Sequence, residues 1–301
     1  LPFDPRIALL AACASLATVA LVDADRIGVG ARVVPSRPVQ QFVAQTELVE
    51  VYATVTDDKG RFVTDLRQDE FTVREDGVAQ SISTFADGEQ PVSIALAVDR
   101  SWSMADGRLA VAQRGGRELL LELGDRDRAM LVAVGSDVDV PVPLTDDRRT
   151  VDAALQALDP WGSTALNDAV MLAFDAIEPA PGRRALVLVS DGLERNSRTT
   201  ADEVLKRVRA SDVLAYPVVL ERKVPKVLET LADTTGGRAH RVRRTSDLPA
   251  VMRRIASELR HQYLVGYQPL RPPRAGEYRR IDVAVSRRDH VVRARAGYVS
   301  R

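Results

Sequence analysis

The stretch that decides the fold covers residues 94–103 and has the sequence IALAVDRSWS. Five apolar residues in a row predict a buried β-strand, and a tight turn carrying the carboxylate of Asp99 and the hydroxyls of Ser101 and Ser103 follows it. Carboxylate and hydroxyl oxygens are the hard ligands that Mg²⁺ and Ca²⁺ prefer. The turn is therefore a candidate metal site.

Two further segments place oxygen-bearing side chains at the ends of predicted elements. Residues 161–164, WGST, precede an amphipathic segment, so that Thr164 lies at a loop-to-helix junction. Residues 184–192, RALVLVSDG, predict a second apolar strand, which ends at an acid and a glycine. The acids alone could simply cap helices, since helix N-caps favour them. The carboxyl ends of parallel strands, however, line one edge of an open sheet, and we expect five side chains to converge there: Asp99, Ser101, Ser103, Thr164 and Asp191.

Three motifs in this order carry a family resemblance. The D-x-S-x-S turn, the GSTALND segment at residues 162–168 and the VLVSDG segment at residues 187–192 resemble a von Willebrand factor A (VWA) domain with its metal-ion-dependent adhesion site (MIDAS). The resemblance covers roughly residues 91–260. It implies that the five side chains bind one Mg²⁺, with Ca²⁺ and Mn²⁺ as alternatives, and that an acidic residue of a protein partner completes the coordination.

The chain departs from the family pattern at the metal-binding turn. Trp102 stands where the family often has glycine, and Arg100 flanks the same turn. Both side chains are bulky. They would either shield the metal or select its partner.

The middle of the chain alternates between apolar runs and amphipathic segments. Nearly continuous apolar runs are typical of parallel strands covered on both faces, and they occur at residues 93–99, 129–135, 184–190 and 213–220, with a shorter edge strand at 138–144. Helical periodicity predicts helices near residues 108–123, 150–158, 165–177, 201–210, 225–234 and 247–261. This order predicts an α/β fold with a doubly wound, mostly parallel sheet.

The regions on either side of this domain have the two-residue period of β-strands. Before it, the predicted strands are residues 49–56, then 71–74 and 78–85 around an Asp-Gly turn, which is a strong hairpin signal. After it, they are residues 263–267, 280–286 and 291–298. About three strands make too small a core alone. We therefore predict one β-sandwich from residues 46–88 and 262–301, with the VWA domain (91–261) inserted; two separate flanking sheets are the alternative.

The first residues predict the compartment. Residues 7–22 are a 16-residue apolar stretch that follows Arg6, which is short for a membrane span of about 20 residues. We interpret residues 1–24 as a secretory signal, followed by a linker at 25–45, and expect a secreted, periplasmic or cell-envelope protein. Residues 10–13, LAAC, also match the pattern at which bacterial lipoproteins are cleaved, so a lipid anchor at Cys13, the only cysteine, is the alternative.

Charge is balanced over the chain but not along it. There are 42 Lys and Arg and 42 Asp and Glu, yet residues 201–301 contain 22 basic and 11 acidic residues. We expect no nucleic-acid binding, because the arginines of this region alternate with Val and Ile as on the solvated face of a sheet; they include Arg241, Arg243, Arg244, Arg279, Arg280, Arg287, Arg288, Arg293 and Arg295. The acids of the N-terminal strands and turns are likewise interpreted as solvated: Glu50, Asp69, Glu70 and Glu75.

The motifs of common enzyme classes are missing from the sequence. There is no G-x-S-x-G motif and no phosphate-binding G-x-x-x-x-G-K loop, and the three histidines lie far apart. A metal hydrolase would usually have histidines or more carboxylates around its ion, so that reading is the less favoured one. We expect a protein-binding module rather than an enzyme, with a structural scaffold carrying a vestigial metal site as the competing hypothesis.

Overall fold

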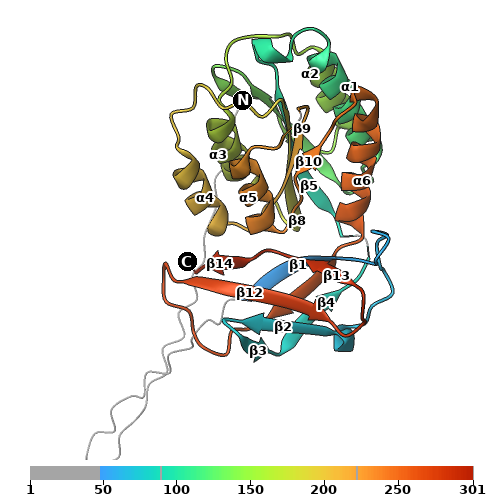
Figure 1. Ribbon diagram of the computed structural model, residues 1–301, viewed down its shortest axis with the longest axis vertical. Helices are drawn as coiled ribbons and strands as arrows, with labels where there is room; N and C mark the ends of the chain where they lie inside the picture. The colour runs from blue at the N-terminus through green and yellow to red at the C-terminus, as the bar shows by residue number, and fades with distance from the viewer. Residues whose placement is uncertain (1–47, 89, 222, 301) are drawn as a thin grey trace, which may run out of the picture. The chain divides into compact units, whose positions relative to one another are not determined.

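The computed structural model describes residues 48–88, 90–221 and 223–300. The predicted signal, the linker and Cys13 lie outside these residues. Within them, a six-stranded sheet between two layers of helices is joined to two four-stranded sheets that pack on each other (Figure 1). The predicted α/β fold with a small β-sandwich is confirmed.

The six-stranded sheet has the strand order β10-β9-β8-β5-β6-β7. All neighbouring strands are parallel except β7, which is antiparallel to β6 at one edge. Each central strand is an apolar run, as the sequence predicted, and every residue of β5 is buried. The strands are β5 (Val92–Asp99), β6 (Arg128–Val134), β7 (Val138–Thr145), β8 (Arg183–Ser190), β9 (Leu214–Val219) and the short β10 (His240–Arg241), which was not predicted.

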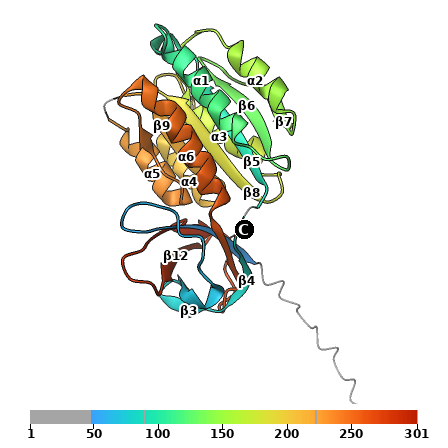
Figure 2. The ribbon, with the colours of Figure 1, turned by 90° about the vertical axis from the view of Figure 1, so that its right-hand side faces the viewer.

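Helices cover both faces of this sheet (Figures 1 and 2). Side chains alternate along β5, so that Ile94, Leu96 and Val98 pack in one apolar cluster and Ala95 and Ala97 in the other. The first cluster includes α1 (Arg108–Leu121), α2 (Arg148–Gln156) and α6 (Leu248–Arg260). The second includes α3 (Leu166–Ile177), α4 (Ala201–Arg209) and α5 (Lys226–Thr235). All six helices lie where the hydrophobic period predicted them.

Two glycines in the middle of α1 allow close helix packing. A Cβ on Gly115 would lie 2.6 Å from the Leu248 side chain of α6, and one on Gly116 would lie 2.7 Å from Leu155 of α2. Glycine costs a helix about 1 kcal/mol relative to alanine. Here that cost is offset by the close approach of two neighbouring helices.

The β-sandwich is built from both ends of the described chain. One sheet has the order β13-β1-β11-β4 and the other β14-β12-β2-β3, and an apolar cluster containing Val51, Phe71, Tyr263 and Ile281 fills the space between them. The strands are β1 (Val49–Thr56), β2 (Phe71–Glu75), β3 (Val78–Gln80), β4 (Ile82–Ala86), β11 (Tyr263–Tyr267), β12 (Tyr278–Val285), β13 (Val291–Arg293) and β14 (Gly297–Val299).

Two strands predicted as continuous are each divided between the sheets. Residues 78–85 form β3, which pairs with β2, and β4, which pairs with β11 in the other sheet. Residues 291–298 likewise form β13, which pairs with β1, and β14, which pairs with β12. In each case the backbone changes its hydrogen-bonding partner within a few residues. The period-2 pattern does not report that change, because it continues across the break.

The expected solvated arginines are only partly solvated. Arg280 and Arg288 are exposed, but Arg279 is 1% exposed and lies against Glu75, which is 3% exposed. Arg293 and Arg295 are also partly buried. The expectation was wrong for these residues. Arg279 pairs with Glu75 inside the sandwich and Arg293 pairs with Glu258 of α6, whereas no ion pair with a described residue explains the burial of Arg295.

A buried polar network joins α6 to the sandwich. Glu258 of α6 accepts hydrogen bonds from Tyr216 Oη at 2.8 Å and from Arg293. Arg183 stacks over the Tyr52 ring at 4.9 Å and donates to the backbone carbonyls of Leu259, in the last turn of α6, and Gln262, just beyond it. These contacts satisfy carbonyls that a helix end leaves without partners.

Candidate metal-ion site

Asp99 is the last residue of β5 and is fully buried. Both of its carboxylate oxygens accept hydrogen bonds, Oδ1 from the Ser101 backbone N–H at 2.9 Å and Oδ2 from Ser190 Oγ at 2.6 Å. Burial raises the pKa of Asp99 above its ordinary value, while these hydrogen bonds act to lower it. The carboxylate is therefore fixed in direction at the edge of the sheet.

The two serines of the turn face each other. Ser101 Oγ and Ser103 Oγ are 3.0 Å apart, within the short 3₁₀ turn η2 (Trp102–Met104) and the residue before it. Met104 is fully buried and anchors the turn against the core. The turn thus holds two hydroxyl oxygens close together beside Asp99.

Thr164 lies in a loop that is joined to this turn through the backbone. Trp102 N–H donates to Gly162 O at 3.0 Å, and Trp161 N–H donates to Arg100 O at 2.6 Å. Thr164 is 1% exposed, and its Oγ1 is buried without a hydrogen-bond partner among the described residues. A buried hydroxyl without a partner costs free energy, so this atom needs an explanation.

Asp191 directly follows β8. Strand β5, which ends at Asp99, pairs with β8 on one side and with β6 on the other. Asp191 is 2% exposed, and its Oδ1 accepts from the Leu193 backbone N–H at 3.0 Å. No described residue donates a hydrogen bond to its Oδ2, although Arg108 Nη1 lies 3.6 Å away. The same Arg108 Nη1 lies 3.4 Å from Ser103 O, so Asp191 is next to the serine turn.

The structure brings the five predicted residues to one edge of the sheet. Ser101, Ser103 and Thr164 line one open cavity of about 480 Å³. The loop after Asp191 is connected to the same place, because Arg195 and Asn196 N–H both donate to Thr164 O, at 3.0 and 2.9 Å. The convergence of the five predicted residues is thus seen in the structure, whereas their role as metal ligands stays a prediction.

Sequence reasoning missed two residues of this site. Ser190 orients the Asp99 carboxylate, and Arg108 places a positive charge between Asp191 and Glu221. The signal for Ser190 was its position at the end of β8, one residue before Asp191. Arg108 has no comparable signal, because only the tertiary fold brings the start of α1 to this edge.

Asp168 stabilises the loop next to the site. Its two carboxylate oxygens accept from the backbone N–H groups of Arg198 and Thr199, at 3.0 and 2.9 Å. Burial acts to raise its pKa, but these hydrogen bonds prevail and the pKa is lowered. The residue fixes the end of the Asp191 loop against the start of α3.

The donor set fits a hard divalent cation. Two carboxylates and three hydroxyls are the ligand types that Mg²⁺ accepts, together with water. Two of the oxygens, Thr164 Oγ1 and Asp191 Oδ2, are buried and have no hydrogen-bond donor among the described residues. Nowhere in this part of the chain do three or more His, Cys, Asp or Glu side chains gather to hold a metal. The candidate site depends on its hydroxyls.

Large apolar side chains surround the site and face solvent. Trp102 is 66% exposed, and Trp161 and Leu193 are each 42% exposed. The Arg100 guanidinium lies 5.3 Å from the centre of the Trp161 ring, a cation–π geometry. We call Trp102, Trp161 and Leu193 the apolar rim.

Comparison with known proteins identifies the central domain. Residues 94–194 match the family model of the von Willebrand factor type A domain. A comparison with curated proteins gave no match. The part of the chain from residue 94 to residue 194 is a VWA domain, and the predicted resemblance is confirmed there.

Two solved structures with TM-scores above 0.5 agree with this fold. A von Willebrand factor type A protein from Catenulispora acidiphila is 13% identical, with a TM-score of 0.52 over 86% of this chain and 75% of that one. Proximal thread matrix protein 1 from the mussel byssus is 13% identical, with a TM-score of 0.53 over 62% and 51%. An aerotolerance-related membrane protein from Bacteroides fragilis is 19% identical, with a TM-score of 0.47 over 56% and 99%. Identities this low show the fold alone.

Proposed function

We propose that the protein binds another protein through a metal ion, held by Asp99, Ser101, Ser103, Thr164 and Asp191. VWA domains are commonly protein-interaction modules. The observation that supports the proposal most directly is the pair of buried oxygens, Thr164 Oγ1 and Asp191 Oδ2, that lack hydrogen-bond donors among the described residues. A cation beside Asp99 would satisfy both.

Mg²⁺ is the metal that this donor set suits best, with Ca²⁺ and Mn²⁺ as alternatives. Mg²⁺ prefers six oxygen ligands and keeps some of its waters. A bound ion held by few charged ligands would offer a coordination position to a carboxylate from outside. An aspartate or glutamate of a protein partner is therefore the expected occupant.

The apolar rim indicates which residues the partner has beside its acidic side chain. Trp102 is 66% exposed and lines the same cavity as Ser101 and Ser103. Its ring is therefore available to a partner, which favours selection of the partner over shielding of the metal. Trp102 and Trp161 are held next to each other by the two backbone hydrogen bonds between their loops. Exposed tryptophans on a fixed backbone are typical of interaction sites. The partner's acidic residue is expected to have apolar neighbours.

We propose binding rather than catalysis at this site. The Ser101 and Ser103 hydroxyls face each other, and the Ser190 hydroxyl donates to Asp99. A nucleophilic serine needs a base that accepts its proton, most often histidine. The arrangement instead suits hydroxyls that act as neutral ligands.

A secreted, periplasmic or cell-envelope location remains the proposal from residues 1–24, with lipid anchoring at Cys13 as the alternative. No helix in residues 48–300 that the structure describes has the length and apolar character needed to cross a membrane.

Isothermal titration with MgCl₂ after EDTA treatment tests the metal site. We expect binding by the wild type and a loss of at least about tenfold in affinity, or ~1.4 kcal/mol, in Asp99→Asn and Ser103→Ala. The matched control is Asp233→Asn, an exposed acid on α5, which should bind like the wild type. Absence of binding by the wild type would favour the scaffold hypothesis.

Capture of a partner tests the second half of the proposal. Immobilised protein is incubated with envelope extract in MgCl₂ or in EDTA, and captured proteins are compared with those on Asp99→Asn and Trp102→Ala. A partner that depends on Mg²⁺ and on both residues supports the proposal. A partner retained equally in EDTA and by Asp99→Asn would assign binding to another surface.

A further inference from the structure

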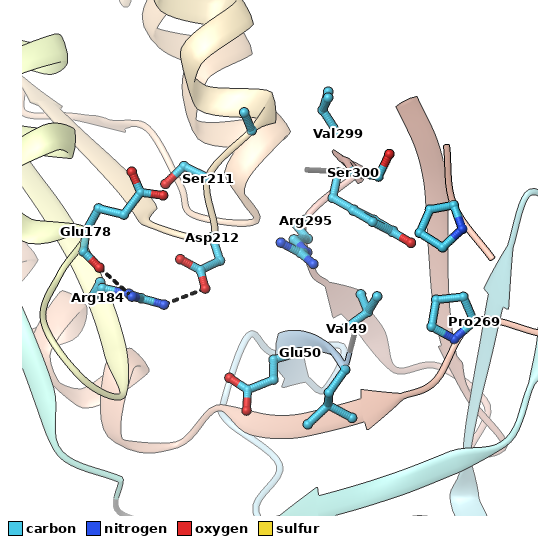
Figure 3. Close-up of a pocket in the computed structure, with 14 residues that line it drawn as sticks. Val49, Glu50, Glu178, Arg184, Ser211, Asp212, Pro269, Arg295, Val299 and Ser300 are labelled. Carbon is cyan, nitrogen blue, oxygen red and sulfur yellow. Dashed lines mark hydrogen bonds and ion pairs between the residues drawn. The ribbon is translucent and has the colours of Figure 1, made fainter. Parts of the chain in front are cut away.

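A second cavity lies away from the metal site, between the sandwich and the α/β domain (Figure 3). Its walls come from the start of β1, the loop between α4 and β9, and the region of β14. Its volume is about 220 Å³, several times the ~30 Å³ that one water occupies in the liquid. A molecule of amino-acid size fits this space.

Three of the five charged residues that line the cavity already have partners. Arg184 pairs with Asp212 at 2.5 Å and donates to the backbone carbonyl of Glu178 at 2.7 Å. The Glu178 carboxylate pairs with Arg207. Two lining charges remain, Arg295 and Glu50.

Arg295 forms no ion pair with any described residue, although the charges of Asp212 and, more weakly, Glu50 act on it from a distance. Its Nε is buried and has no hydrogen-bond partner among the described residues. Its guanidinium lies 5.4 Å from the centre of the Tyr298 ring. One face of the guanidinium therefore stacks on the ring, and the N–H groups at the edge of the guanidinium stay available for hydrogen bonds to a ligand. Burial lowers the pKa of Arg295, which means that the site disfavours the charge as it stands.

Glu50 provides the opposite charge on the β1 wall. It is half-buried, and no hydrogen bond or ion pair joins its carboxylate to any described residue, Arg295 included. Figure 3 shows both side chains around the same space, with Val49 and Asp212 beside them. The two charges attract each other across the cavity without contact.

We propose that this cavity binds a small zwitterion, such as a free amino acid, whose carboxylate pairs with Arg295 and whose ammonium group pairs with Glu50. A guanidinium edge matches a carboxylate in a two-point hydrogen bond, and an ammonium group donates to a carboxylate. The ligand bridges two charges that the protein holds apart. It also buries them as compensated pairs, which removes the cost of the unpartnered guanidinium.

Calorimetric titration of the full chain with glycine, L-alanine and L-glutamine tests the proposal. Acetate and methylammonium serve as ligands that carry one half of the charge. We expect at least one amino acid to bind, and each half-ligand to bind at least about tenfold more weakly. If none of the three amino acids binds the wild type, the proposal is wrong.

Two variants assign the contacts. Arg295→Met should abolish binding of both the amino acid and acetate, whereas Glu50→Gln should weaken the amino acid at least about tenfold and leave acetate unchanged. Arg209→Met, an exposed arginine of α4, is the matched control. Equal affinity in Arg295→Met and the wild type would overturn the assignment.

Unfolding of Arg295→Met without ligand provides an independent readout. Its unfolding equilibrium constant should rise by no more than about 30-fold, or ~2 kcal/mol of unfolding free energy, because the lost charge had no ion-pair partner and only the stacking on Tyr298 is removed. A larger loss would indicate that Arg295 has an internal anion, which contradicts the proposal. Asp99→Asn should bind the zwitterion normally, so this site and the metal site are tested separately.

Discussion

Two regions of the molecule bury acids in opposite ways. In the sandwich, Glu75 is 3% exposed and both of its oxygens are in use: Oε1 accepts from Arg279 at 2.5 Å, and Oε2 from Tyr267 and Tyr298 at 2.8 and 3.0 Å. At the edge of the six-stranded sheet, Asp191 is equally buried, yet its Oδ2 accepts no hydrogen bond from the described residues.

The difference distinguishes a structural acid from a binding acid. A buried charge costs several kcal/mol unless it is compensated, and the Glu75 cluster carries its own cation and donors. The Asp191 carboxylate has a neighbouring carboxylate in Asp99, which acts to raise the pKa of Asp99, and the Arg108 guanidinium lies 3.6 Å from its Oδ2 without a hydrogen bond. The Glu75 cluster is complete, and we propose that the Asp191 cluster receives a cation from outside.

Glu75→Ala is expected to have the largest effect. It removes the anion of a buried pair and leaves Arg279, 1% exposed, with less compensation, which costs about 3–5 kcal/mol of unfolding free energy. Urea denaturation measures the loss. Asp233→Ala, which removes an exposed acid, should change stability by less than about 0.5 kcal/mol. A similar loss of unfolding free energy in both variants would mean that the Glu75 cluster does not stabilise the fold more than an exposed acid does.

Asp191→Asn should behave in the opposite way. In EDTA we expect it to be about as stable as the wild type, because removing one of two neighbouring carboxylates offsets the loss of the 3.6 Å ion pair with Arg108. With MgCl₂ at 100 times the dissociation constant, the wild type should gain about 2.7 kcal/mol and the variant little. Thermal unfolding in both buffers checks this. Destabilisation in EDTA as severe as that of Glu75→Ala would remove the contrast between the two regions.

His240 extends the comparison to a group that stays neutral. Burial, and then the charges of Arg238, Arg293 and Arg254, lower its pKa from 6.5 to about 4. The folded state therefore binds fewer protons than the unfolded state between these values. Its contribution to stability is complete above pH 6.5 and decreases as the pH falls to about 4, by roughly 1–3 kcal/mol.

Chemical denaturation between pH 4 and pH 7 measures this effect for the wild type and for His240→Gln. The variant should lose less stability over that interval, while the carboxylates titrate alike in both proteins. Parallel curves for the two proteins would show that His240 is protonated as easily in the folded state as in the unfolded one.

The smallest effect is expected for Thr164→Val. The hydroxyl that it removes has no hydrogen-bond partner among the described residues, so stability in EDTA should change by less than about 1 kcal/mol, while affinity for Mg²⁺ falls. Ser190→Ala is the matched comparison, because its hydroxyl donates to Asp99 at 2.6 Å and its loss should cost about 1–3 kcal/mol. Denaturation in EDTA should rank the two variants in this order.

The sequence predicted the α/β domain well because its signals are long. Runs such as residues 94–98 and 184–190 are too apolar to be anything but buried, and amphipathic helices lie between and after the strands. The convergence of Asp99 and Asp191 also followed, since it depends only on strand direction, whereas Thr164 was predicted from the motif of the loop before α3. The sandwich was harder, because two-residue alternation continues where β3 passes to β4 and does not say which sheet each belongs to.

The burial of Glu75 and Arg279 could have been found and was not. Along β2 the residues Phe71, Val73 and Glu75 share the buried face, and along β12 Arg279 shares a face with Ile281. The alternation therefore placed both charges inside. Composition suggested that they were solvated. Glu75 lies opposite Ile281, two residues from Arg279 on the same inner face, and these opposite charges on one buried face were the signal that outweighed composition.

The pairing of β1 with β11 and β13 brings together residues some 200 positions apart. During synthesis β1 thus emerges long before its neighbouring strands exist, and both of its edges stay unpaired until the end of the polypeptide is made. The VWA domain can fold in the meantime, because all its strands lie between. A chaperone that binds this protein during folding would therefore have to cover the edges of the N-terminal strands until the C-terminal strands have been synthesised.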